Sequence, residues 1–102
     1  METYYKPEDL PKFSEIREGS PELWEKFSDW YGAVFKAGAL SEREKALIAL
    51  AVAHAVQCPY CIDAYTTASL EAGANPDQIT EAIHVSAAMA ARRLPSRIYQ
   101  NR

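Results

Sequence analysis

Helix-start signals restrict the fold of this chain more than any other feature of its sequence. Ser20 and Pro21 precede an acidic residue, which is typical of a first helical turn because a hydroxyl caps free amides and proline needs no hydrogen bond there. Asn75 and Pro76 repeat this pattern, and Gln78 occupies the position at which a capping box needs a side-chain acceptor. These signals predict helices that begin near residues 21 and 76.

The apolar residues have helical spacing, so we expect an all-α domain with four main helices. In the first helix they recur every three or four residues and form one broad face: Leu23, Phe27, Trp30, Tyr31, Val34 and Phe35. A capping box of Ser41 and Glu44 opens the second helix, which runs to about residue 56 and is apolar on nearly every side. Gly73 is expected to end the third helix, and Pro95 is expected to stop the fourth.

Chain length and charge bound the domain organisation and the partners. The 102 residues suit a single domain at 1–102, with an irregular N-terminal arm at 1–19 and a basic tail at 92–102, for which an altered terminus and a disordered end both stay open. Because a small domain buries a modest fraction of its surface, we expect a homo-oligomer that shares a core. The net charge of −3 argues against nucleic-acid binding, although the tail would suit RNA or an acidic partner; its basic residues are Arg92, Arg93, Arg97 and Arg102.

Signals for membrane insertion and export are missing from the sequence. No segment approaches the roughly 18 apolar residues of a transmembrane helix, and residues 1–7 lack the apolar run of a secretory signal. We therefore expect a cytoplasmic protein without a membrane partner. In that compartment, two cysteines are more often redox-active or metal-binding than a permanent structural bridge.

Cys58 and Cys61, in the run Cys-Pro-Tyr-Cys, are the most informative residues for function. Pro59 disfavours the helical conformation at Cys58, so we expect Cys58 at or just before the N-cap of the third helix and Cys61 within its first turn. Cysteines placed in this way can form a disulfide with little backbone movement. Unpaired amides and the helix dipole would favour the thiolate of Cys58, and a thiolate attacks peroxides and disulfides.

Zinc binding and chemically idle core cysteines are the alternatives to a redox pair. A closed zinc site needs four ligands, and only His54 and His84 remain, without finger-like spacing, so we expect no metal and no cofactor. His54, four residues before Cys58, is a candidate proton acceptor, and Tyr65 is a candidate hydrogen-bond partner on the helical face of Cys61. For both residues, a core position with its polar atoms satisfied elsewhere stays open. His84 is expected to be structural or to lie at a subunit contact.

The run 40–61, which ends in the cysteine pair, resembles the carboxymuconolactone decarboxylase/alkylhydroperoxidase D (AhpD-like) family. The continuation to about residue 90 fits as well, with one helix ending at 71–74 and another beginning after Asn75-Pro76-Asp77. The N-terminal arm and first helix also resemble the arsenosugar-biosynthesis-associated, peroxidase-like branch. The resemblance implies an all-α fold in which a two-helix unit holds the cysteines, assembled as trimers or hexamers.

The resemblance also implies a chemistry for the pair. It suggests a thiol-dependent peroxidase-like or disulfide redox protein that acts on a small hydroperoxide or oxidised metabolite and is restored by an external thiol reductant. In the peroxidase members the second cysteine attacks and the first resolves, which by position are Cys61 and Cys58. That order is the reverse of the one that the helix dipole favours. The decarboxylase branch lacks the pair, so we do not expect decarboxylation of a muconolactone.

Two residues depart from the pattern of the peroxidase members. Ala46 stands where those members carry a glutamate, and Tyr65 stands where they carry a histidine. Two members of the usual proton relay are therefore missing, and His54 is the candidate replacement. The alternative function is a non-enzymatic oligomeric helical scaffold or binding protein with a decayed relay.

Overall fold

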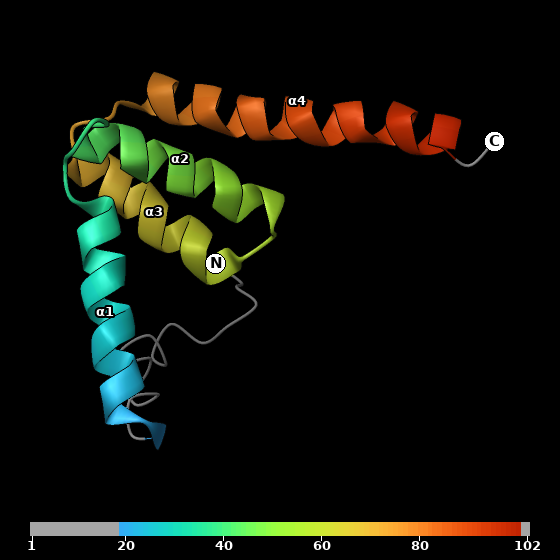
Figure 1. The fold of residues 1–102 in the computed structure, drawn as a ribbon. Coiled ribbons are helices and arrows are strands. Elements are labelled where there is room, and N and C mark those ends of the chain that lie inside the picture. Colours follow the sequence, from blue (N-terminus) through green and yellow to red (C-terminus); the bar gives the residue numbers. More distant parts are fainter. Residues whose placement is uncertain (1–18, 101–102) are drawn as a thin grey trace. The chain divides into compact units, whose positions relative to one another are not determined.

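The computed structural model describes residues 19–100, with side chains to Arg92, and this part of the chain is helical without strands (Figure 1). The predicted all-α fold is confirmed. The expected N-terminal arm lies outside the described residues, apart from Gly19. The helices are α1 (Pro21–Phe35), α2 (Glu42–Ala55), α3 (Pro59–Glu71) and α4 (Pro76–Gln100).

The chain divides into two compact units, at residues 1–42 and 43–102. In the first unit, α1 has the predicted apolar face. The centroids of the Phe27 and Tyr31 rings are 5.6 Å apart, and those of the Tyr31 and Phe35 rings are 5.1 Å apart. The expected hydroxyl cap is wrong, because Ser20 occupies the N-cap but its side chain makes no capping hydrogen bond. The helix begins with Pro21, whose fixed φ suits a first helical position.

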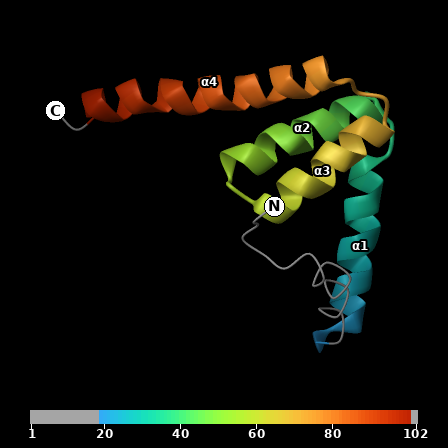
Figure 2. The ribbon, with the colours of Figure 1, turned by 180° about the vertical axis from the view of Figure 1, so that it is seen from behind.

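The second unit is built on a hairpin of α2 and α3, which lie side by side in both views (Figures 1 and 2). Leu50 of α2 is fully buried, as is Ser69 of α3. Ala46 and Ala53 complete the buried side of α2. The expectation that α2 is apolar on nearly every side is correct, but only one side is buried in the single chain. Its other apolar row is exposed and consists of Ile48 and Val52, continued by Val56 directly after the helix.

The turn between α2 and α3 has Schellman geometry. The Gln57 N–H donates to the His54 carbonyl oxygen at 3.2 Å, and the Cys58 N–H donates to that of Ala53 at 3.1 Å. Gln57 has a φ of 56°, in the left-handed region that glycine usually occupies. At the end of α3, Gly73 takes the same role with a φ of 95°, as predicted.

The start of α4 confirms the predicted capping box. The Gln78 N–H donates to Asn75 Oδ1 at 2.8 Å, and the Asn75 N–H donates to Gln78 Oε1 at 3.0 Å. The helix contacts α3. The prediction that Pro95 stops α4 is wrong, since the helix continues to Gln100 and takes in most of the basic tail. Pro95 removes one N–H donor, but the run 87–94 consists of strong helix formers, which favour continuation.

None of the helices described between residues 19 and 100 has the length and apolarity needed to cross a bilayer.

Candidate redox site

Cys58 lies at the junction of α2 and α3, and its backbone is bonded to both helices. Its N–H completes the end of α2 through the carbonyl oxygen of Ala53, at 3.1 Å. Its own carbonyl oxygen accepts the N–H of Ile62 at 2.9 Å, the first hydrogen bond of α3. Its extended backbone, with a φ of −105° and a ψ of 97°, is what a residue before proline adopts. The predicted N-cap position is therefore confirmed, and two helices fix the base of the side chain.

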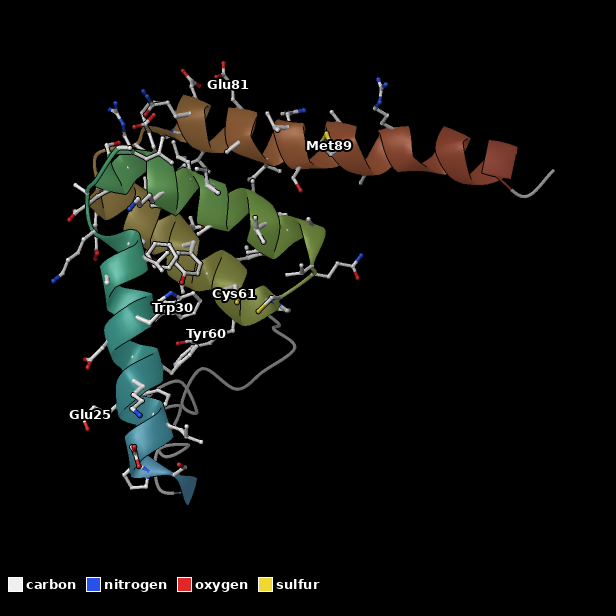
Figure 3. The ribbon with its side chains drawn as sticks, in the orientation of Figure 1. Glu25, Trp30, Tyr60, Cys61, Glu81 and Met89 are labelled. Carbon is white, nitrogen blue, oxygen red and sulfur yellow. The ribbon has the colours of Figure 1, made fainter. Side chains whose placement is uncertain are left out.

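The sulfur of Cys58 caps α3. Cys58 Sγ accepts the backbone N–H of Cys61 at 3.3 Å, in the role that a serine or aspartate oxygen usually has. Figure 3 shows Cys61 in the first turn of α3, as predicted. Both thiols are free and half-buried. A negative charge on Cys58 Sγ would be stabilised by this N–H and by the positive end of the helix dipole.

The two thiols differ in their electrostatics. Burial raises the pKa of the Cys61 thiol from 9.0 to about 11, and the hydrogen bond and charge of Cys58 act in the same direction. Cys61 therefore stays protonated at neutral pH. A Cys61 thiol that keeps its proton does not fit the attacking role that the resemblance implies for it.

His54 is held in one tautomer near the end of α2. Its Nδ1 lies 2.9 Å from the carbonyl oxygen of Leu50. Because a carbonyl only accepts, Nδ1 carries the proton, and Nε2 of the neutral ring is the acceptor. The hydrogen bonds described between residues 19 and 92 join the ring to Leu50 and not to a cysteine sulfur. His54 is thus placed one turn before Cys58 as a base of defined tautomer.

The remaining candidates lie around this junction or away from it. Tyr65 is half-buried on α3, one turn after Cys61. Ala46, at the position of the missing glutamate, is buried in α2 and brings no carboxylate. His84 is exposed on α4 and is therefore not a core residue. Its expected role at a subunit contact stays a prediction. Among the described side chains, no cluster of three histidine, cysteine or acidic residues could hold a metal.

Sequence reasoning missed the left-handed conformation of Gln57, which directs the chain from α2 into α3. No local signal could have identified it, because glycine or asparagine is the usual residue at such a position.

The sequence profile of the carboxymuconolactone decarboxylase family matches residues 21–93, a range that contains both cysteines and most of the described helices. This chain belongs to that family. The prediction made from the run 40–61 is therefore confirmed at the level of the family. Its narrower part, the arsenosugar-associated branch, stays a prediction.

Two solved structures are similar to this chain. An apo crystal structure of a family member from Legionella pneumophila is 32% identical, with a TM-score of 0.74, over 80% of this chain and 73% of that one. A protein from Methanobacterium thermoautotrophicum is 34% identical, with a TM-score of 0.78, over 83% of this chain and 96% of that one.

A curated relative shares more of the sequence over a shorter stretch. It is uncharacterised protein 4 in the cox locus of Paracoccus denitrificans, 52% identical over 58 residues, or 57% of this chain. The chain spans about half, 52%, of that relative's length. These likenesses establish the family and the fold, while the chemistry depends on the residues of the site.

Proposed function

We propose that this protein is a thiol-dependent redox protein, peroxidase-like or active on disulfides, in which Cys58 and Cys61 cycle between dithiol and disulfide. The observation that carries the proposal is the hydrogen bond from the Cys61 N–H to Cys58 Sγ, at 3.3 Å, at the start of α3. This contact supports the proposal because a backbone N–H at a helix start favours a thiolate, and a second cysteine in the same turn can form a disulfide with it. The substrate class is a small hydroperoxide or an oxidised metabolite.

The proposed cycle has three balanced steps. A thiolate attacks the hydroperoxide, and after protonation gives a sulfenic acid and an alcohol. The second thiol displaces the sulfenic hydroxyl as water and forms the disulfide. An external dithiol then restores both cysteines by thiol–disulfide exchange and is itself oxidised.

His54 is the proposed proton acceptor of this cycle. Its Nδ1 is occupied by the Leu50 carbonyl oxygen, so the proton from a cysteine thiol would go to Nε2. Tyr65 is proposed as a hydrogen-bonding group one turn after Cys61. In these roles the two residues would replace the glutamate and histidine that the chain lacks.

Thiol counting tests the proposal. One equivalent of tert-butyl hydroperoxide should consume both free thiols of the reduced protein and lower its mass by two hydrogen atoms, because one disulfide forms. His54→Ala should slow this reaction about 10²-fold, the lower range for a general base. His84→Ala is the matched control, since His84 is exposed on α4. A hydroperoxide that consumes no thiol would contradict the proposal.

The alternative is an oligomeric scaffold or binding protein without turnover. The exposed apolar row of α2 favours association, and Ala46 in the relay position favours loss of catalysis. Steady-state hydroperoxide consumption with a dithiol reductant separates the two functions. A scaffold would show no turnover while still associating.

A further inference from the structure

We propose that Cys58, rather than Cys61, is the nucleophile of the pair, and that Cys61 is the resolving thiol. The assignment rests on the proposed redox function and reverses the order that the family resemblance implies for this chain.

The hydrogen bonding at the start of α3 favours Cys58 as the nucleophile. Cys58 Sγ accepts a backbone N–H at the N-terminus of α3, where the dipole of the helix also favours negative charge. Cys61 supplies that N–H from within the helix, so its backbone stabilises charge on the sulfur of Cys58. The start of α3 therefore directs a hydrogen-bond donor at the sulfur of Cys58.

Backbone hydrogen bonds on both sides hold Cys58 in place. Its N–H is bonded to the end of α2 and its carbonyl oxygen to the first turn of α3. The left-handed Gln57 directs the chain into this arrangement, and a non-glycine residue adopts that conformation only where the surrounding structure enforces it. A nucleophile held in this way approaches its electrophile without reorganising the backbone.

The environment of Cys61 favours its protonated form. Burial and the neighbouring Cys58 raise the pKa of its thiol to about 11, so Cys61 keeps its proton at neutral pH. The attacking form of a resolving cysteine is the thiolate, so this proton is released as Cys61 attacks. When Cys61 attacks the Cys58 sulfenic acid, its proton leaves with the hydroxyl group as water, and the sulfur–sulfur bond replaces the sulfur–oxygen and sulfur–hydrogen bonds.

These roles define the order of the reaction steps. The Cys58 thiolate attacks the terminal oxygen of a hydroperoxide, breaks the oxygen–oxygen bond, and yields an alcohol after protonation. Cys61 then forms the disulfide with loss of water. An external dithiol reduces this bond and takes up the two oxidising equivalents.

Selective alkylation tests which sulfur is the nucleophile. The reduced full-length protein receives less than one equivalent of iodoacetamide at neutral pH, and peptide mapping by mass spectrometry quantifies the label on each cysteine. We expect Cys58 to react several-fold faster, because a backbone N–H is directed at its sulfur while the Cys61 thiol keeps its proton at neutral pH. Both cysteines are half-buried, so neither is fully shielded from the reagent.

The same reaction in urea is the control, since unfolding removes the helix and the burial and should bring the two rates together. Equal labelling in the folded protein, or faster labelling of Cys61, would overturn the assignment.

The single variants separate this assignment from the proposed function. With tert-butyl hydroperoxide and dimedone, which traps sulfenic acids, Cys61→Ser should gain the adduct and Cys58→Ser should not. If only Cys58→Ser gains it, the assignment is wrong and the redox function stands. If neither variant nor the wild type reacts, the peroxidase chemistry fails, and the alkylation rates alone decide which thiol is the nucleophile.

Discussion

At the scale of single residues, Cys58 has two structural roles besides its chemistry. It completes the hydrogen bonding at the end of α2 and caps the start of α3 with its sulfur. Its redox state and the order of the turn are thereby linked, because the sulfur that would form the disulfide is also a helix cap. The electrostatics of Cys61 depend on the same contact.

The first prediction concerns the Cys61 pKa. Cys58→Ser should lower it from about 11, because the charge and the thiol hydrogen bond of Cys58 contribute to the increase. Burial, the largest cause, should still hold it above 9.0. Alkylation of Cys61 as a function of pH, followed by peptide mapping, measures the change. An unchanged midpoint would show that Cys58 does not act on Cys61.

The raised pKa has a consequence for stability. Since the folded chain binds the Cys61 proton more tightly than the unfolded chain, this contribution is fully present below pH 9.0 and is lost as the pH rises to about 11. The free energy of unfolding should therefore fall more steeply over this window in the wild type than in Cys61→Ser. Urea titrations of both proteins at several pH values give the difference.

A second residue-scale prediction concerns Gln57. Gln57→Gly should raise the free energy of unfolding by about 0.5 kcal/mol, since relief of a left-handed conformation worth roughly 1–2 kcal/mol outweighs the entropy that glycine loses on folding. Gln57→Ala is the control and should stay near the wild type, because alanine meets the same strain. Urea unfolding measures both, and a gain with alanine as large as that with glycine would refute the explanation.

At the scale of helices, α1 and α4 begin with similar signals but are capped differently. Both have proline at the first helical position, but only Asn75 makes a side-chain cap, while Ser20 makes none. The difference between α1 and α4 at this position is thus the capping side chain and not the proline.

Paired N-cap substitutions test this difference. Asn75→Ala should lower the free energy of unfolding by about 1 kcal/mol, because an orphan N–H of α4 loses its acceptor. Ser20→Ala should change it by less than about 0.5 kcal/mol, as for an ordinary surface position. Denaturant titration measures both values, and equal losses would contradict the assignment of the caps.

The α2–α3 hairpin contains a buried hydroxyl without a partner. Ser69 Oγ is fully buried and has no hydrogen bond within the described structure. Ser69→Ala should therefore raise the free energy of unfolding by about 1 kcal/mol, the lower range for an unsatisfied buried polar group. Thr66→Val is the control, since the Thr66 hydroxyl donates to the Ile62 carbonyl oxygen at 2.7 Å and its loss should destabilise. Destabilisation by Ser69→Ala would point to a partner of this hydroxyl.

At the scale of the whole molecule, the described part of the chain exposes an apolar surface along α2. The exposed row of α2 is made of side chains with half or more of their surface accessible: Ile48 at 50%, Val52 at 53% and Val56 at 65%. Spaced by four residues, they form one stripe along the helix. A contiguous apolar stripe is typical of an interaction surface, which supports the expected homo-oligomer.

Oligomer formation through this stripe is the whole-molecule prediction. The wild type should elute and sediment as a multiple of the single chain, and Val52→Lys should shift it towards the monomer, because a charge would be placed in an apolar contact. Thr67→Lys, at an exposed polar position of α3, is the matched control. Sedimentation velocity gives the masses, and a monomeric wild type would refute the prediction.

Most of the fold was predictable from the sequence because its signals are local. Proline positions, capping residues and apolar spacing act over one or two helical turns, and they located the starts of α1, α3 and α4. Pro95 was misinterpreted because the helical preference of its flanking residues prevailed over the missing N–H. Ser20 was misinterpreted because residue type shows that a hydroxyl is present but not that it makes the capping hydrogen bond.

By itself, the sequence determined where the helices begin, the family, and the position of Cys58 at a helix start with Cys61 in the first turn. Only the tertiary structure decided how the two thiols differ. Burial of Cys61 depends on what packs around α3, and the capping bond to Cys58 Sγ depends on a turn closed by a left-handed Gln57. Neither is a property of the local sequence, because desolvation and backbone direction are set by residues brought together only when α2 and α3 fold back on each other.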